Sequence, residues 1–223
     1  MPTTSSPPSI TTLNHDSIAP RLQPDLAEEL TVRWVDSIEE LESLKQPWNR
    51  LAERSLYTNA SFEPNFLIPA LRYFGNSNVK VLIVEGSGSS HENNSTRIYG
   101  LMPLVKKSFY HLPVKCLEIW SHDQSFDHTP LLCKVHAAKT LEAMLNFLAQ
   151  ERIGLLSLDT VSREPEFQSI IESLIQRPGR SRFQRDQFSR AAFRPVTAFE
   201  DHQKHFVSKS VKKNYGRLNR RLS

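Results

Sequence analysis

Two apolar stretches near the middle of the chain decide its fold: Val79-Lys-Val-Leu-Ile-Val84 and Arg97-Ile-Tyr-Gly-Leu-Met-Pro-Leu-Val105. Both are short and rich in β-branched and large apolar residues, which favour buried strands. The polar residues 86–95 between them contain two glycines and are typical of a turn. The sequence therefore predicts an antiparallel pair of buried strands.

Outward from this pair, the apolar pattern alternates between strand and helix. We expect further strands over residues 30–35, 115–120, 153–158 and 183–188. We expect helices over residues 37–51, broken or restarted at Pro47, and over 64–74, 136–150, 164–176 and from 197 onward. Capping boxes at Ser37 and Thr197 mark two of the helix starts. This order predicts an α/β or α+β sheet domain with helices packed on it.

Length and composition limit the chain to one packed domain with polar segments attached, because it has 223 residues of which 39% are hydrophobic. Residues 1–28 are rich in Ser, Thr and Pro, so we expect a disordered tail there. The sheet domain then covers residues 29–195, and a basic helix covers 196–223. No apolar run approaches the roughly twenty residues of a membrane span, and no apolar segment typical of a secretory signal follows Met1.

The two cysteines, Cys116 and Cys133, stand apart from any CxxC or Cys/His cluster. We therefore expect no metal site. Both thiols lie in apolar surroundings, and we interpret them as free, packed side chains in a reducing cytoplasm rather than as a disulfide.

The positive charge gathers at the C-terminal end. The net charge is +4, yet residues 203–223 hold seven Lys and Arg and no Asp or Glu. Val211, Tyr215, Leu218 and Leu222 are spaced by three and four, which predicts an amphipathic helix. Three interpretations stay open: a helix that docks on a partner, a solvated surface, and a site for phosphate-rich ligands such as nucleic acid. Docking is favoured, and nucleic acid is the least favoured.

The densest group of ionisable side chains outside this end is Ser121-His-Asp-Gln-Ser-Phe-Asp-His128. It follows the strand expected over 115–120, and loops at strand ends commonly carry function. His122, Asp123, Asp127 and His128 are the candidate catalytic residues, because His and Asp side chains can deprotonate an amine or a hydroxyl. The alternative is a hydrogen-bonded loop whose Asp side chains support turns.

Several short motifs follow one another in a recognisable order. They are Leu44-Lys-Gln-Pro-Trp48-Asn-Arg-Leu51, Ala60-Ser-Phe62-Glu-Pro64, Tyr99-Gly-Leu-Met-Pro103-Leu104, Leu117-Glu-Ile-Trp-Ser-His-Asp123 with Asp127, Leu155 to Asp159, and the closing Phe206-Val-Ser-Lys209-Ser-Val-Lys-Lys-Asn214-Tyr-Gly-Arg217-Leu-Asn-Arg220-Arg221-Leu222. In this order they resemble the CelD/BcsL-type acyltransferases of bacterial exopolysaccharide biosynthesis, a branch of the GNAT superfamily related to FemABX-type transferases. The resemblance covers roughly residues 31–222.

This resemblance implies a GNAT-like mixed sheet flanked by helices and acyl transfer from acyl-CoA to an amine or hydroxyl of a small-molecule or sugar acceptor. Members of the family have two GNAT-type halves, and the second usually holds the acyl-CoA site. The chain resembles the N-terminal half, with residues 196–223 as the helix that leads into the second. We therefore expect a truncated or split member that is inactive alone and depends on a missing or separate half.

No residue is assigned to acyl-CoA. The glycine-rich piece Gly86-Ser-Gly88 precedes an expected strand, whereas a phosphate cradle needs a helix N-terminus, so it predicts a hairpin loop. A different class of function stays open as the alternative: a non-catalytic binding or scaffolding module that docks a partner through its basic helix.

Overall fold

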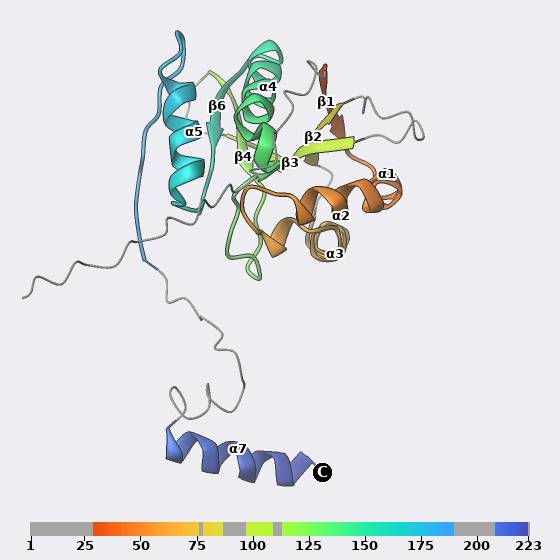
Figure 1. Ribbon diagram of the computed structural model, residues 1–223, viewed down its shortest axis with the longest axis vertical. Helices are drawn as coiled ribbons and strands as arrows, with labels where there is room; N and C mark the ends of the chain where they lie inside the picture. The colour runs from red at the N-terminus through yellow and green to blue at the C-terminus, as the bar shows by residue number, and fades with distance from the viewer. Residues whose placement is uncertain (1–28, 76–77, 87–96, 109–112, 190–207, 223) are drawn as a thin grey trace, which may run out of the picture. The chain divides into compact units, whose positions relative to one another are not determined.

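The computed structural model describes residues 29–75, 78–86, 97–108, 113–189 and 208–222 (Figure 1). The chain divides into two compact units, one that ends at Arg180 and one that begins at Ser181. The expected tail over 1–28, residues 87–95 of the expected turn and the capping box at Thr197 lie outside the described residues.

One mixed sheet of six strands forms the first unit. Its strands are β1 (Leu30–Val35), β2 (Val79–Gly86), β3 (Arg97–Lys107), β4 (Lys115–Ile119), β5 (Leu131–Leu132) and β6 (Ile153–Ser157). The order is β1-β2-β3-β4-β6, and β5 pairs with β3. Strands β1 to β4 are antiparallel, whereas β4 and β6 are parallel. The expected mixed α/β sheet flanked by helices is confirmed.

The helices of this unit are α1 (Ile38–Ser43), α2 (Lys45–Glu53), α3 (Pro64–Phe74), α4 (Ala137–Gln150) and α5 (Pro165–Ile175), with 3-10 turns η1 (Ala60–Phe62) and η2 (Lys134–His136). Ser37 caps α1, since its side chain accepts a hydrogen bond from the Glu40 N–H at 3.3 Å. A new helix starts at Lys45, which places Pro47 in a first turn where its missing N–H leaves no gap in the helix.

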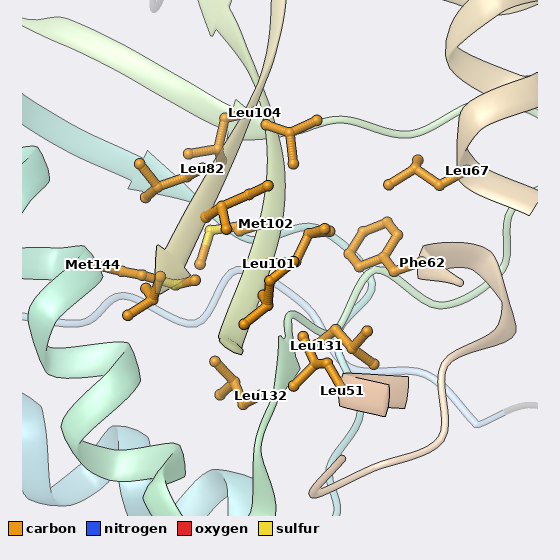
Figure 2. Close-up of a cluster of buried hydrophobic side chains, with 14 of the residues drawn as sticks. Leu51, Phe62, Leu67, Leu82, Leu101, Met102, Leu104, Leu131, Leu132 and Met144 are labelled. Carbon is orange, nitrogen blue, oxygen red and sulfur yellow. The ribbon is translucent and has the colours of Figure 1, made fainter. Parts of the chain in front are cut away.

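Different helices pack on the two faces of the sheet. Trp34, Leu82 and Met102 are cross-strand partners and therefore share one face. Figure 2 shows Met144 of α4 on the side of Leu82 and Met102, and Phe62 and Leu67 on the side of Leu101. Helix α2 covers this second face, and α3 packs against α1, α2 and η1 on the same side (Figure 1). The sheet is thus the middle layer between α4 and the α2–α3 pair.

Strand β5 continues the line of β4 along β3. Ile119 at the end of β4 pairs with Leu104, and Leu131 in β5 pairs with Leu101 on the same side of β3. Residues 120–130 therefore form an insertion in what is otherwise one strand. The sequence did not predict β5, because two residues carry no periodicity.

The strand expected over residues 183–188 is wrong. Residues 181–189 have no regular structure, and Phe183 is 88% exposed. Two phenylalanines in a run of polar residues gave an apparent strand signal, but no neighbouring strand pairs with it in the described sheet. The second unit contains α7 (Lys209–Leu222), which agrees with the helix expected at the C-terminal end.

Candidate functional site

The insertion 120–130 meets the loop after β6 at the carboxyl ends of the two parallel strands. The His128 N–H donates to the Thr160 carbonyl at 3.1 Å, and the Ser162 N–H donates to the Thr129 hydroxyl at 2.7 Å. Carboxyl ends of parallel strands commonly form the crevice in which an α/β protein binds its ligand. This part of the sheet is therefore the first candidate for a site.

His128 is 5% exposed and has partners at both ring nitrogens. Its Nδ1 lies 3.1 Å from the Asp159 carbonyl oxygen, and its Nε2 lies 2.8 Å from Oγ of Ser125. A carbonyl oxygen only accepts, so in the neutral ring Nδ1 carries the proton. The single proton of the Ser125 hydroxyl has two acceptors within reach, Nε2 of His128 and the His122 carbonyl oxygen at 2.8 Å. His128 is therefore a buried, fully partnered member of a hydrogen-bonded loop.

Asp127 supports a turn, as the alternative interpretation of this loop expected. Its Oδ1 accepts from the Thr129 N–H at 2.8 Å and from the Thr129 hydroxyl at 2.7 Å. The carboxyl group also faces Tyr57. Burial raises the pKa of the Tyr57 hydroxyl, the hydrogen bond with Ser162 lowers it, and the charge of Asp127 raises it further. Asp127 therefore belongs to a polar network that joins the 120–130 insertion, the loop after β6 and the segment that contains Tyr57.

His122 lies among aromatic rings instead. Its ring stacks on Phe74 at 5.0 Å and on Phe66 at 5.7 Å between centroids, and the Trp120 ring lies at 5.2 Å. Phe66 and Phe74 are eight residues apart on α3, which is roughly 12 Å along a helix axis. A ring that stacks on both at such distances lies between them.

The surroundings of His122 favour its neutral form. Burial lowers the pKa of His122, as does the nearby His128, while Asp123 opposes the shift. The His122 Nδ1 accepts the Gln124 N–H at 3.2 Å, so the neutral ring carries its proton on Nε2. His122 can therefore donate a hydrogen bond from Nε2. Its other nitrogen is already engaged and is not available as a base. Asp123 itself is exposed at the surface of the loop.

A pocket of about 260 Å³ opens beside this aromatic cluster. Its walls come from α3 and from the start of the 120–130 insertion, and its lining residues are Asn65, Phe66, Pro69, Ala70, Tyr73, Phe74, His122 and Gln124. Three of the aromatic side chains are partly open to solvent: Phe66 at 38%, Phe74 at 60% and Tyr73 at 77%. The exposed lining is almost entirely apolar and aromatic, and the hollow is open to solvent.

Helical spacing over residues 64–74 predicts that Phe66 and Phe74 lie on the inner side of the helix, which is wrong. Helix α3 buries Leu67, Ile68 and Leu71 instead. The signal that identifies the pocket is an excess: α3 has more large apolar residues than one face can bury, and it leaves Phe66, Tyr73 and Phe74 exposed.

The four candidate residues are not brought together in one site. His122 lines the pocket, His128 and Asp127 belong to the polar network, and Asp123 is exposed at the surface of the loop. Ser125 connects the pocket and the network, because its Oγ also accepts the His122 backbone N–H at 3.1 Å. Sequence reasoning missed Ser125 and Tyr57 as members of this arrangement, since hydroxyl groups give no periodic signal.

Residues 54–59 run alongside β5. The Leu56 N–H donates to the Leu132 carbonyl at 2.7 Å, and the Lys134 N–H donates to the Arg54 carbonyl at 3.0 Å. The amide of Asn59 donates to the Thr129 carbonyl at 2.7 Å. Residues 54–59 therefore occupy the outer edge of β5. Helix α4 starts without a side-chain cap, and no glycine stands in residues 120–136 before it.

Within the described parts of the chain, no cluster of three or more His, Cys, Asp or Glu could hold a metal ion. Both cysteines are buried and free. A search of the described helices finds none with the length and apolar character to cross a bilayer.

No protein-family model matches the sequence, and no curated protein matches it. The structure is similar to an aminoglycoside acetyltransferase from an uncultured soil metagenomic sample, with 13% identity over 74% of this chain and 97% of that one and a TM-score of 0.43. A GNAT family acetyltransferase from Staphylococcus aureus has 14% identity over 73% and 98% and a TM-score of 0.40.

A third neighbour, AAC(6′)-Iy in complex with a CoA bisubstrate analogue, has 10% identity over 74% of this chain and 99% of that one and a TM-score of 0.41. The neighbours are GNAT acetyltransferases, and no residue of this chain takes a role from them at such scores.

Proposed function

We propose that this chain is a GNAT-type acyltransferase-family module whose aromatic pocket binds the acceptor of acyl transfer from acyl-CoA. One observation carries the proposal: the pocket opens beside the loop that holds all four candidate catalytic residues, and His122 belongs to both. The acceptor is an amine or hydroxyl of a small molecule, with a sugar or polysaccharide precursor as the favoured class.

The walls of the pocket fit such an acceptor. The faces of Phe66 and Phe74 offer apolar area to the C–H face of a ring. At one side Nε2–H of His122 and the amides of Asn65 and Gln124 offer hydrogen bonds that fix its orientation. In this proposal His122 contacts the acceptor, Asp123 lies at the loop surface as the exposed base, and Asp127 and His128 position the loop.

The described residues do not fit acyl-CoA. Residues 54–59 occupy the outer edge of β5, and α4 has no glycine-rich approach that could cradle a pyrophosphate. We therefore assign the acyl donor to a separate half. The chain alone then has no transferase turnover, and its buried thiols agree with the cytoplasm as the proposed location.

The lack of a glycine-rich approach to α4 also favours a second candidate function. A chain that binds a small molecule but has no donor site can act as a non-catalytic binding or scaffolding module. The two functions are distinguished by adding a donor-binding half to the chain. Acyl transfer to the bound molecule then begins if the chain is an acyltransferase module, and does not begin if it is a non-catalytic binding module.

Saturation-transfer NMR on the full chain tests the acceptor pocket. The probes are a set of amino sugars, neutral sugars and aromatic amines. We expect binding of at least one class, loss of that binding in Phe74→Ala, and no change in Phe183→Ala, which removes an equally large exposed side chain far along the sequence. Binding that survives Phe74→Ala, or no binding by any probe, contradicts the proposal.

A further inference from the structure

Helix α7 (Lys209–Leu222) separates its apolar and its cationic positions onto opposite sides. Its sequence, KSVKKNYGRLNRRL, contains six Lys and Arg and no acidic residue. An α-helix turns by about 100° per residue, so positions 211, 215, 218 and 222 fall within an arc of about 60°. These positions are Val, Tyr, Leu and Leu.

The cationic positions occupy the opposite side. Four cationic positions centre about 180° from the apolar row: 209, 213, 217 and 220. The other two, 212 and 221, lie between the two rows, one on each side of the helix. Val211 is 43% exposed and Tyr215 is 65% exposed, so at least the first half of the apolar row is open.

We propose that α7 binds the surface of an anionic lipid bilayer, with the row of positions 211, 215, 218 and 222 in the acyl boundary and its cations at the headgroups. Amphipathic helices with a basic polar face lie in the interface in this way. The complementary charge comes from the lipid, since a helix with six Lys and Arg and no acidic residue fits an anionic surface. Tyr215 fits the interface, where its ring is apolar and its hydroxyl stays wet.

The apolar row favours a lipid surface over nucleic acid as the ligand of α7. Binding to a phosphate backbone needs cations alone and is independent of apolar residues on the far side. A helix of 14 residues is also shorter than the roughly twenty that span a bilayer, so α7 lies on the surface. This inference is independent of the proposed acyltransferase function.

Liposome co-sedimentation of the full chain tests the proposal, with phosphatidylcholine vesicles compared with vesicles that also contain phosphatidylserine. We expect binding to the anionic vesicles only, weakened by salt. The variant Lys209→Gln/Lys213→Gln/Arg217→Gln should bind on the order of a hundredfold more weakly. The variant Lys106→Gln/Arg163→Gln/Arg185→Gln has the same net charge, removes exposed cations outside α7, and should bind like the unchanged chain.

A third variant, Val211→Ser/Tyr215→Ser/Leu218→Ser, keeps every cation and removes most of the apolar row. We expect it to lose vesicle binding, while the thermal unfolding of the first unit stays unchanged. Vesicle binding that survives this variant overturns the proposal. Absence of vesicle binding by the unchanged chain, with or without binding to duplex DNA in an anisotropy titration, overturns it too.

Discussion

The hydroxyl oxygen of Ser125 lies 2.8 Å from Nε2 of His128, beneath the loop that carries His122. The same oxygen accepts the backbone N–H of His122. One small side chain thus links the buried polar network at the ends of β4 and β6 to the wall of the aromatic pocket. The shape of the pocket therefore depends on a residue that does not line it.

Ser125→Ala is expected to destabilise the first unit by about 1–3 kcal/mol, because the buried Nε2 of His128 loses its partner. Urea unfolding measures the change. The control is Ser173→Ala on the exposed side of α5, whose hydroxyl only bonds to a carbonyl of its own helix and should matter far less. Equal effects of the two variants would show that the bond to His128 contributes nothing.

The stability of the first unit should fall as the pH falls through the range in which His122 titrates. The folded pKa of His122 is lowered, chiefly by burial, below the unfolded value near 6.5. The unfolded chain therefore binds the proton first, so the stabilisation is complete above about pH 6.5 and is lost below it. His122→Phe keeps a ring between Phe66 and Phe74 and should flatten this dependence. An NMR titration that gives His122 an ordinary or raised pKa contradicts the assignment.

Gly100→Ala should destabilise the sheet by about 1–3 kcal/mol through overpacking. A Cβ at position 100 would lie 2.5 Å from Cγ2 of Thr140 and 2.9 Å from Cε of Met144, so α4 crosses β3 at this glycine. Gly154→Ala is the matched control: its Cβ would meet only Val114, at 3.2 Å, on an exposed edge. Thermal denaturation compares the two, and similar losses would argue against the close crossing.

Deletion of residues 1–28 should leave the melting temperature within a couple of degrees, because a stretch dominated by Ser, Thr and Pro buries little apolar area. Calorimetry of the shortened chain checks this. A loss of cooperative unfolding would show that the segment packs on the domain.

Most of the fold was predictable, because its long elements carry strong periodicity. Helix α3 runs from Pro64 to Phe74 as expected, and Trp48 is fully buried with Nε1 donating to the Phe62 carbonyl at 2.9 Å. The Pro at the first position of α3 and the apolar row of α4 are signals that act within one segment. Such local signals are what a sequence displays.

The arrangement of the candidate site was less predictable. Proximity along the chain grouped His122 with His128, but their partners come from different elements: Phe66 and Phe74 of α3 for one, Asp159 after β6 for the other. The pairing of residues 54–59 with β5 likewise depends on a hydrogen bond between Leu56 and Leu132, which are 76 positions apart in the sequence. No local pattern encodes these pairings.

Isothermal titration of the full chain with acetyl-CoA tests the central claim most directly, namely that this chain is an acceptor-binding module without a donor site of its own. We predict no saturable heat, because α4 has no glycine-rich approach and residues 54–59 occupy the outer edge of β5. Micromolar binding with a one-to-one stoichiometry would contradict the account and would identify a self-sufficient enzyme.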